Sequence, residues 1–168
     1  MHAHRFNSIV HFTTPDKTNG INIPSPASGK VLPIDVDDPA NAGDGVKIRL
    51  EGQRVASPIN GDILEISPCH GKVLIQAKNK LRLLIYLPFE YGEFHGLGIN
   101  PKVAEGQSVK KGQTLLELDL FKIQRKLKPA DLYVVLLSTD VFKQINVPHK
   151  YVECACDTLF SLIPYKKK

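Results

Sequence analysis

The chain has 168 residues, of which 42% are apolar and 23% charged, and its formal net charge is +5. This composition is typical of one globular domain with a buried core, and no apolar run approaches the roughly 18 residues of a membrane span. The chain has no Trp and only 7% aromatic residues, which argues against a nucleic-acid-binding platform of basic and stacking side chains. The first residues lack the apolar stretch of a secretion signal, so we expect a cytoplasmic protein.

The three cysteines are an odd count in a chain of this length, which excludes a disulfide framework. Cys154 and Cys156 are two residues apart, so on a strand both would point to the same side. We expect them to be buried thiols.

Residues 1–20 are polar and contain three His. Their few apolar residues would suit an added strand or a weak membrane-surface helix, and we interpret the segment as a tail or an edge segment. Residues 21–168 are interpreted as a single domain.

A ten-residue phrase occurs twice, at residues 25–34 and 57–66. Each copy reads Ser-Pro, two variable residues, Gly and then an apolar run. Pro suits a turn or a strand edge because it lacks an N–H donor, and Gly allows the positive φ that a tight turn often needs. Two such turn-plus-strand units predict a compact β architecture.

The strands that follow are short and alternate with turns. Residues 43–45 form a Gly-Asp-Gly turn, and apolar residues alternate strictly at 46–50. A strand at 73–77 leads through a hairpin loop at 78–80 into a strand at 81–87.

The second half of the chain adds one helix. Asp119 can cap it with its carboxylate, apolar residues at helical spacing continue to Leu127, and Pro129 stops it. The residues at 138–140 are predicted to cap a single helical turn that reaches Ile145. Further strands are predicted at residues 115–118, 133–137, 151–155 and 158–164.

The Glu-Gly-Gln phrase at residues 105–115 occurs in several β-rich carrier modules, including biotinyl and lipoyl domains. Such a domain needs an exposed Lys at a hairpin tip, usually flanked by Met. Lys78 and Lys80 are at a predicted tip, but Met1 is the only Met. A lipoyl-like carrier is therefore a minor alternative.

After residue 20 the chain resembles the glucose-type IIA domain (EIIA) of the bacterial sugar phosphotransferase system. The matching phrases keep their order over most of the chain, at residues 25–29, 43–46, 56–61, 105–112 and 117–120, together with Gly52 and His70. The resemblance implies an all-β fold, an antiparallel β-sandwich or barrel-sandwich with a few short helical turns.

Members of this family accept a phosphoryl group from a phosphohistidine on the carrier protein HPr and pass it to a IIB domain. The resemblance implies two facing His side chains in a shallow apolar depression, and His70 matches the first. The second, phosphorylated His matches Tyr86. A neutral imidazole is a nucleophile at pH 7, whereas a phenol with a pKa of about 10 is a poor one without a base. We therefore expect a degenerate EIIA that has lost phosphoryl transfer.

An active phosphocarrier working through His70 or His95 is the alternative, because a loop could bring His95 towards His70. The family can also hold Zn²⁺ between its paired His and a partner's carboxylate. Here Cys69, His70 and Glu90 form only a loose trio, and we expect no metal and no cofactor.

The hypothesis that follows is a protein-binding or regulatory module rather than an enzyme. Leu87, Phe89 and Glu90 would form its binding face around Tyr86, as exposed apolar and aromatic side chains do in protein interfaces. The resemblance implies HPr, a IIB domain, or regulated permeases and enzymes as partners.

Overall fold

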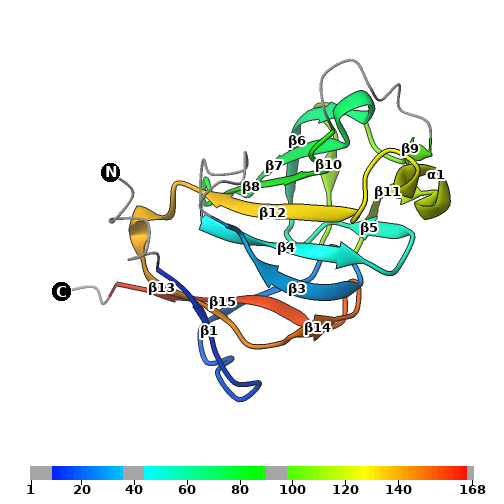
Figure 1. Ribbon diagram of the computed structural model, residues 1–168. Helices are drawn as coiled ribbons and strands as arrows, with labels where there is room; N and C mark the ends of the chain where they lie inside the picture. The colour runs from blue at the N-terminus through cyan, green and yellow to red at the C-terminus, as the bar shows by residue number, and fades with distance from the viewer. Residues whose placement is uncertain (1–8, 36–43, 90–97, 166–168) are drawn as a thin grey trace, which may run out of the picture.

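Fifteen short strands and a few helical turns make up the computed structural model, which describes residues 9–35, 44–89 and 98–165 (Figure 1). The strands form an eight-stranded sheet in the order β10-β6-β7-β8-β12-β4-β3-β14, a four-stranded sheet in the order β1-β13-β15-β2, and a three-stranded sheet in the order β5-β11-β9. Every pairing is antiparallel except that of β1 with β13. The predicted all-β sandwich class is confirmed.

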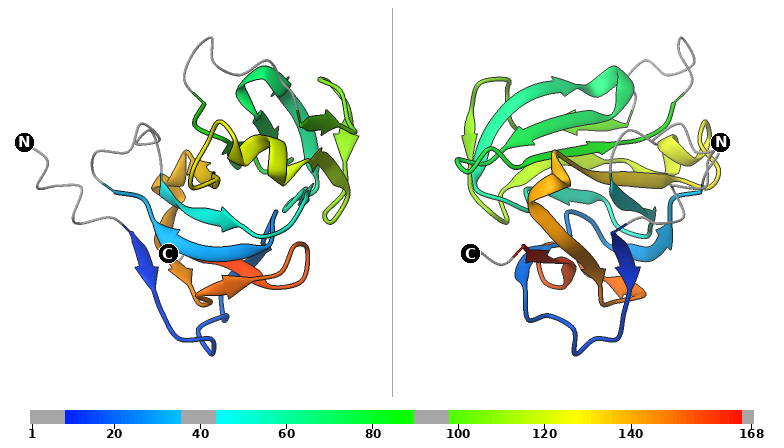
Figure 2. Two further views of the ribbon diagram at one scale, coloured as in Figure 1. Left: turned by 45° about the vertical axis from the view of Figure 1, so that its right-hand side comes forward. Right: turned by 90° about the vertical axis from the view of Figure 1, so that its left-hand side faces the viewer.

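The strands have the following bounds: β1 Val10–Phe12, β2 Ile21–Pro24, β3 Gly29–Pro33, β4 Asp44–Leu50, β5 Arg54–Ala56, β6 Gly61–Ser67, β7 Lys72–Gln76, β8 Arg82–Tyr86, β9 Ile99–Pro101, β10 Ser108–Val109, β11 Thr114–Leu118, β12 Asp131–Leu137, β13 Phe142–Val147, β14 Tyr151–Val152 and β15 Thr158–Pro164. Two 3₁₀ turns, η2 Pro68–His70 and η3 Thr139–Val141, and the helix α1 Leu120–Gln124 complete the described elements. In Figure 2 the β6–β7 hairpin lies at one end of the molecule and β1 with β13 at the other.

Burial alternates along the predicted strands as the sequence pattern requires. Val73 and Ile75 in β7 and Leu83 and Ile85 in β8 are fully buried, and the residues between them are less so. Such alternation places one face of a strand in the core. The central strand β12 is buried on both faces, since its consecutive residues from Asp131 to Leu136 are all buried, and β8 and β4 pair with its two edges.

The two copies of the repeated phrase fold into the same local structure. The Ser25 hydroxyl donates to the Ala27 carbonyl at 2.7 Å, and the Ser57 hydroxyl donates to the Ile59 carbonyl at 2.6 Å. The first turn also contacts the strand that leads into the second, because the N–H of Ala56, the last residue of β5, donates to the Pro26 carbonyl at 2.8 Å. We call residues 25–29 and 57–61 the Ser-Pro turns.

The glycine of each Ser-Pro turn is required mainly by a close backbone approach. A Cβ on Gly29 would lie 2.0 Å from the Arg49 carbonyl oxygen, and one on Gly61 would lie 2.4 Å from that of Gln76. Gly29 has a φ of +153°, but Gly61 is outside the left-handed region. The neighbouring strand, more than the conformational freedom of a turn, therefore selects Gly here.

The helix α1 begins as predicted and ends close to the predicted place. The Asp119 carboxylate accepts the Lys122 N–H at 3.2 Å, which is an N-cap hydrogen bond. A further N–H to carbonyl bond from Leu127 to Ile123 extends the helical turn beyond α1.

Two local predictions are corrected by the structure. The helical turn predicted to reach Ile145 is only the 3₁₀ turn η3, and Phe142–Val147 is the strand β13, because its apolar residues pair with β15 and β1. Cys154 is half-buried and Cys156 exposed, because both lie in a turn after β14 rather than on a strand.

The N-terminal segment contributes the edge strand β1 to the four-stranded sheet, in register with β13 from Val10 opposite Ile145. Among residues 9–35, 44–89 and 98–165, no helix is long and apolar enough to cross a membrane.

Candidate functional site

Two tyrosines and a lysine form a row across three neighbouring strands of the large sheet. The register sets Tyr86 of β8 opposite Tyr133 of β12, and Tyr133 opposite Lys47 of β4. Directly opposed residues of a sheet point to the same side, and this side faces away from the one that carries Ile85 and Val134. We call Tyr86, Tyr133 and Lys47 the tyrosine face.

The side chains of this row contact one another. The Tyr86 and Tyr133 rings are stacked, with centroids 5.3 Å apart and an angle of 21° between their planes. The Lys47 Nζ lies 5.9 Å from the centroid of the Tyr133 ring, within the range of a cation–π contact. Tyr133 is almost fully buried, whereas Tyr86 is partly exposed. Tyr86 is therefore the tyrosine of this row that is better placed for a contact from outside.

An ion pair holds the same face one step along the strands. The Arg49 guanidinium donates two hydrogen bonds to the Asp131 carboxylate, at 3.0 and 3.2 Å. Asp131 is buried, and its hydrogen bond raises the pKa of Arg49. A bidentate pair of this kind fixes the relative position of β4 and β12, and thereby the position of Lys47 beside Tyr133.

The backbone places His70 next to the strand that ends in Tyr86. His70 is the last residue of η2, and Gly71 after it has a left-handed φ of +55°. The Leu87 N–H donates to the Gly71 carbonyl at 3.2 Å. The fold therefore brings the segments of His70 and Tyr86 side by side.

The predicted binding face is only partly at the surface. Leu87 is 1% exposed, so it anchors the end of β8 in the core and cannot belong to an exposed surface. Phe89 is half-buried and packs against the edge of the core. Pro88 lies in a tight turn between them, in which the Phe89 N–H donates to the Leu87 carbonyl at 2.9 Å.

The remaining predicted site residues are not brought together here. Glu90 and His95 lie outside the described residues. Cys69 is exposed in η2. Within the described ranges, no group of three or more His, Cys, Asp and Glu side chains could hold a metal ion.

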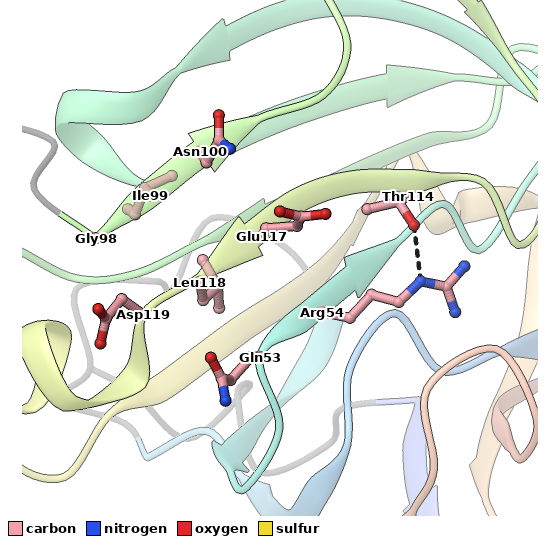
Figure 3. Close-up of a pocket in the computed structure, with 9 residues that line it drawn as sticks. All are labelled: Gln53, Arg54, Gly98, Ile99, Asn100, Thr114, Glu117, Leu118 and Asp119. Carbon is pink, nitrogen blue, oxygen red and sulfur yellow. Dashed lines mark hydrogen bonds between the residues drawn. The ribbon is translucent and has the colours of Figure 1, made fainter.

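A hollow of about 520 Å³ lies on the face of the three-stranded sheet, apart from the tyrosine face (Figure 3). It is lined by Gln53, just before β5, by Arg54 of β5, by Asn100 of β9 and by Glu117 of β11. Arg54 is held in place, because its guanidinium donates to the Thr114 hydroxyl at 2.8 Å and to the Gly112 carbonyl. Sequence reasoning missed this hollow. The exposed Glu117 within an otherwise buried strand was the only signal.

Tyr133 and Lys47 were also missed as members of the site. Tyr133 begins the strand predicted at residues 133–137, and Lys47 is a polar position in the alternation at residues 46–50, so neither pattern marks a site residue. Their pairing with Tyr86 depends on the strand order β8-β12-β4, which joins segments far apart in the chain and leaves no local pattern in the sequence.

Comparisons with known proteins agree on one family. Residues 21–142 match the family "phosphoenolpyruvate-dependent sugar phosphotransferase system, EIIA 1". The chain is 35% identical over 140 residues to the glucose-specific EIIA component of Bacillus cereus, which covers 80% of this chain and 85% of that protein. It is 29% identical over 130 residues to the Haemophilus influenzae protein of the same name, covering 74% and 78%. The structure of glucose permease IIA from Mycoplasma capricolum superimposes with a TM-score of 0.71 at 17% identity, covering 84% of this chain and 95% of that one.

Proposed function

Because the chain belongs to the EIIA 1 family of the phosphoenolpyruvate-dependent sugar phosphotransferase system, we propose that it is an EIIA protein without phosphoryl transfer. It would act in the cytoplasm as a protein-binding regulatory module that keeps the family scaffold. The feature that carries this proposal is Tyr86, which the sequence resemblance assigns to the position of the accepting His and whose ring is stacked on Tyr133.

The chemistry of a phenol supports this proposal. Phosphoryl relay needs an acceptor that is nucleophilic at neutral pH and gives a labile phosphorylated form. The imidazole of His meets both needs, because its pKa is about 6.5 and its N–P bond is labile. A phenol is almost fully protonated at pH 7, and its phosphate ester is too stable to pass on.

The tyrosine face has properties that suit a protein contact instead. Tyr presents a large apolar ring with one polar end, and it is enriched in protein interfaces. The Tyr86 ring is stacked on the almost fully buried Tyr133, so it is held in place before a partner binds. A side chain that is already ordered loses little entropy on binding. The expected partners are HPr, a IIB domain, or permeases and metabolic enzymes that respond to the phosphotransferase system.

The test is phosphoryl transfer from phosphorylated HPr, measured with the wild-type protein and with Tyr86→His. We expect no acid-labile phosphate on the wild type and labelling of Tyr86→His. Tyr133→His is the matched control, because it places the same imidazole one strand away from the acceptor position. It should not be labelled.

Labelling of the wild type would contradict the proposal and favour an active phosphocarrier. The backbone position of His70 beside the end of β8 is the observation that supports this alternative. His70→Gln and His95→Gln would then identify the acceptor, because only the substitution that removes it abolishes the label. Failure of both the wild type and Tyr86→His to bind HPr in a calorimetric titration would contradict HPr as a partner.

A further inference from the structure

A second surface, on and after the helix α1, combines cations with an exposed aromatic ring. Between residues 121 and 128 the chain exposes the following side chains: Phe121, Lys122, Arg125, Lys126 and Lys128. We call these five residues the basic corner. In Figure 1, α1 lies at the right-hand rim of the molecule, remote from β1, β13 and β15.

The anchoring of α1 in the core turns these residues outward. Ile123 is fully buried, and Leu120 and Leu127 pack against the core from the same segment. Residues three and four apart share one face of a helix, so this anchoring face leaves Phe121, Lys122 and Arg125 on the opposite one. Phe121 is 69% exposed, although Leu120 before it and Ile123 two residues after it are used for packing.

A cation lies over the ring of Phe121. The Arg125 guanidinium carbon lies 5.0 Å from the ring centroid, which is a cation–π contact on the surface. The apolar ring and a positive charge are therefore presented together at one point of the surface.

The charges of the basic corner are not neutralised within the described parts of the chain. Lys47, Lys72 and Lys102 form ion pairs with Asp35, Glu65 and Glu117, but no such pair involves the four cations of the corner. Two nearby carboxylates are already engaged. Asp119 accepts the backbone N–H of Lys122, and Asp131 binds Arg49.

We propose that the basic corner binds the surface of an anionic lipid bilayer. Cations attract anionic headgroups at short range, and an exposed aromatic ring among them enters the interface between headgroups and acyl chains. Long lysine side chains adapt to headgroups in any arrangement, so this contact needs no shaped pocket. A single aromatic residue is too few for the stacking platform of a nucleic-acid site. This proposal is independent of the fate of phosphoryl transfer.

The first experiment measures cosedimentation of the full-length protein with vesicles of phosphatidylcholine, with and without phosphatidylglycerol. We expect binding only with phosphatidylglycerol, and its weakening by salt. The variant Lys122→Gln with Lys126→Gln should bind about 25-fold more weakly, since each cation near an anionic surface contributes about fivefold.

The matched control is Lys110→Gln with Lys111→Gln, which makes the same change in net charge at the exposed turn before β11, whereas α1 follows the other end of that strand. It should change binding by less than about twofold, because a surface that faces away from the bilayer is screened by salt. Equal effects of the two double variants would overturn the proposal, because binding would then depend on net charge and not on the corner.

A third pair of variants tests the role of the ring. Phe121→Ser should weaken binding even at high salt, because its contribution is apolar. Tyr151→Ser, which removes a similarly exposed ring from the edge strand β14, should not.

Circular dichroism would verify that all variants are folded. Absence of binding to anionic vesicles would overturn the proposal. If the same residues bound soluble polyglutamate but not the vesicles, the proposal would also fall, and the basic corner would be assigned to an acidic protein.

Discussion

The Ser-Pro turns and the tyrosine face are constrained by the fold in different ways. In the turns, backbone atoms of a neighbouring strand leave no room for a Cβ at Gly29 or Gly61, and buried serine hydroxyls hold the chain. On the tyrosine face, the strand register fixes only where the side chains of Tyr86, Tyr133 and Lys47 meet. The backbone there accepts other side chains. A family scaffold can therefore persist while the chemistry of its site changes.

The largest loss of stability is expected from a substitution that disrupts a Ser-Pro turn. In Gly61→Ala the new Cβ would lie 2.4 Å from the Gln76 carbonyl oxygen, and the paired strand cannot move without losing its hydrogen bonds. We expect the free energy of unfolding to fall by roughly 2–4 kcal/mol. Chemical denaturation would measure it.

Gly106→Ala is the matched control for this prediction. A Cβ on Gly106 meets nothing within 4 Å, but the residue has a φ of +87°. Its substitution therefore isolates backbone strain, which costs about 1 kcal/mol. If the two substitutions cost the same, close approach does not explain the glycine in the repeated phrase.

A smaller loss is expected when a turn keeps its backbone but loses its hydroxyl. Ser57→Ala removes the hydrogen bond to the Ile59 carbonyl in a buried site, and should cost about 1–2 kcal/mol in the free energy of unfolding. Ser108→Ala removes an exposed hydrogen bond of the same length, to Asp62, and should cost less than about 0.5 kcal/mol. Equal losses would mean that burial of the hydroxyl does not matter.

The tyrosine face should contribute less to stability than the turns. A double-mutant cycle with Tyr86→Ala and Tyr133→Ala should give a coupling of about 0.5–1.5 kcal/mol for the stacked pair. Tyr86→His alone should remain folded, because the position is partly exposed and its backbone is regular. A coupling near zero would show that Tyr133 does not hold the Tyr86 ring, and would weaken the case for an ordered contact surface.

Much of the scaffold could be predicted because its signals are local. The alternation at β4, β7 and β8, the Asp119 cap and the repeated Ser-Pro phrase each depend on residues close in sequence. The prediction at residues 141–145 was wrong, because pairing of β13 with β15 and β1 overrode a local helical signal. Strand pairing is a tertiary effect that local propensity cannot include.

The candidate site could be predicted only in part. Tyr86 and His70 were selected because the sequence resemblance assigns them to positions of a family motif, and their role in a site stays a prediction. Tyr133 and Lys47 were missed because they reach Tyr86 through the order of strands, and Leu87 was placed at the surface because its apolar character fitted both a core and a contact. Burial depends on the whole packed structure, so it could not be read from the motif.

The smallest expected effect concerns the thiol that packs on the first Ser-Pro turn. The Cys154 N–H donates to the Ser28 hydroxyl at 2.8 Å, and its thiol donates to the Pro26 carbonyl at 3.2 Å. Burial raises the pKa of the Cys154 thiol, although the nearby Arg54 guanidinium lowers it in part. A raised pKa means a smaller thiolate fraction at a given pH, and the thiolate is the reactive form.

Alkylation by iodoacetamide, followed by mass spectrometry across pH, should therefore show Cys154 reacting more slowly than the exposed Cys156. The increase of its alkylation rate with pH should be displaced to higher pH. In denaturant the two should react alike. Equal rates in the native protein would mean that this turn opens readily, and it would then be no more rigidly held than the tyrosine face.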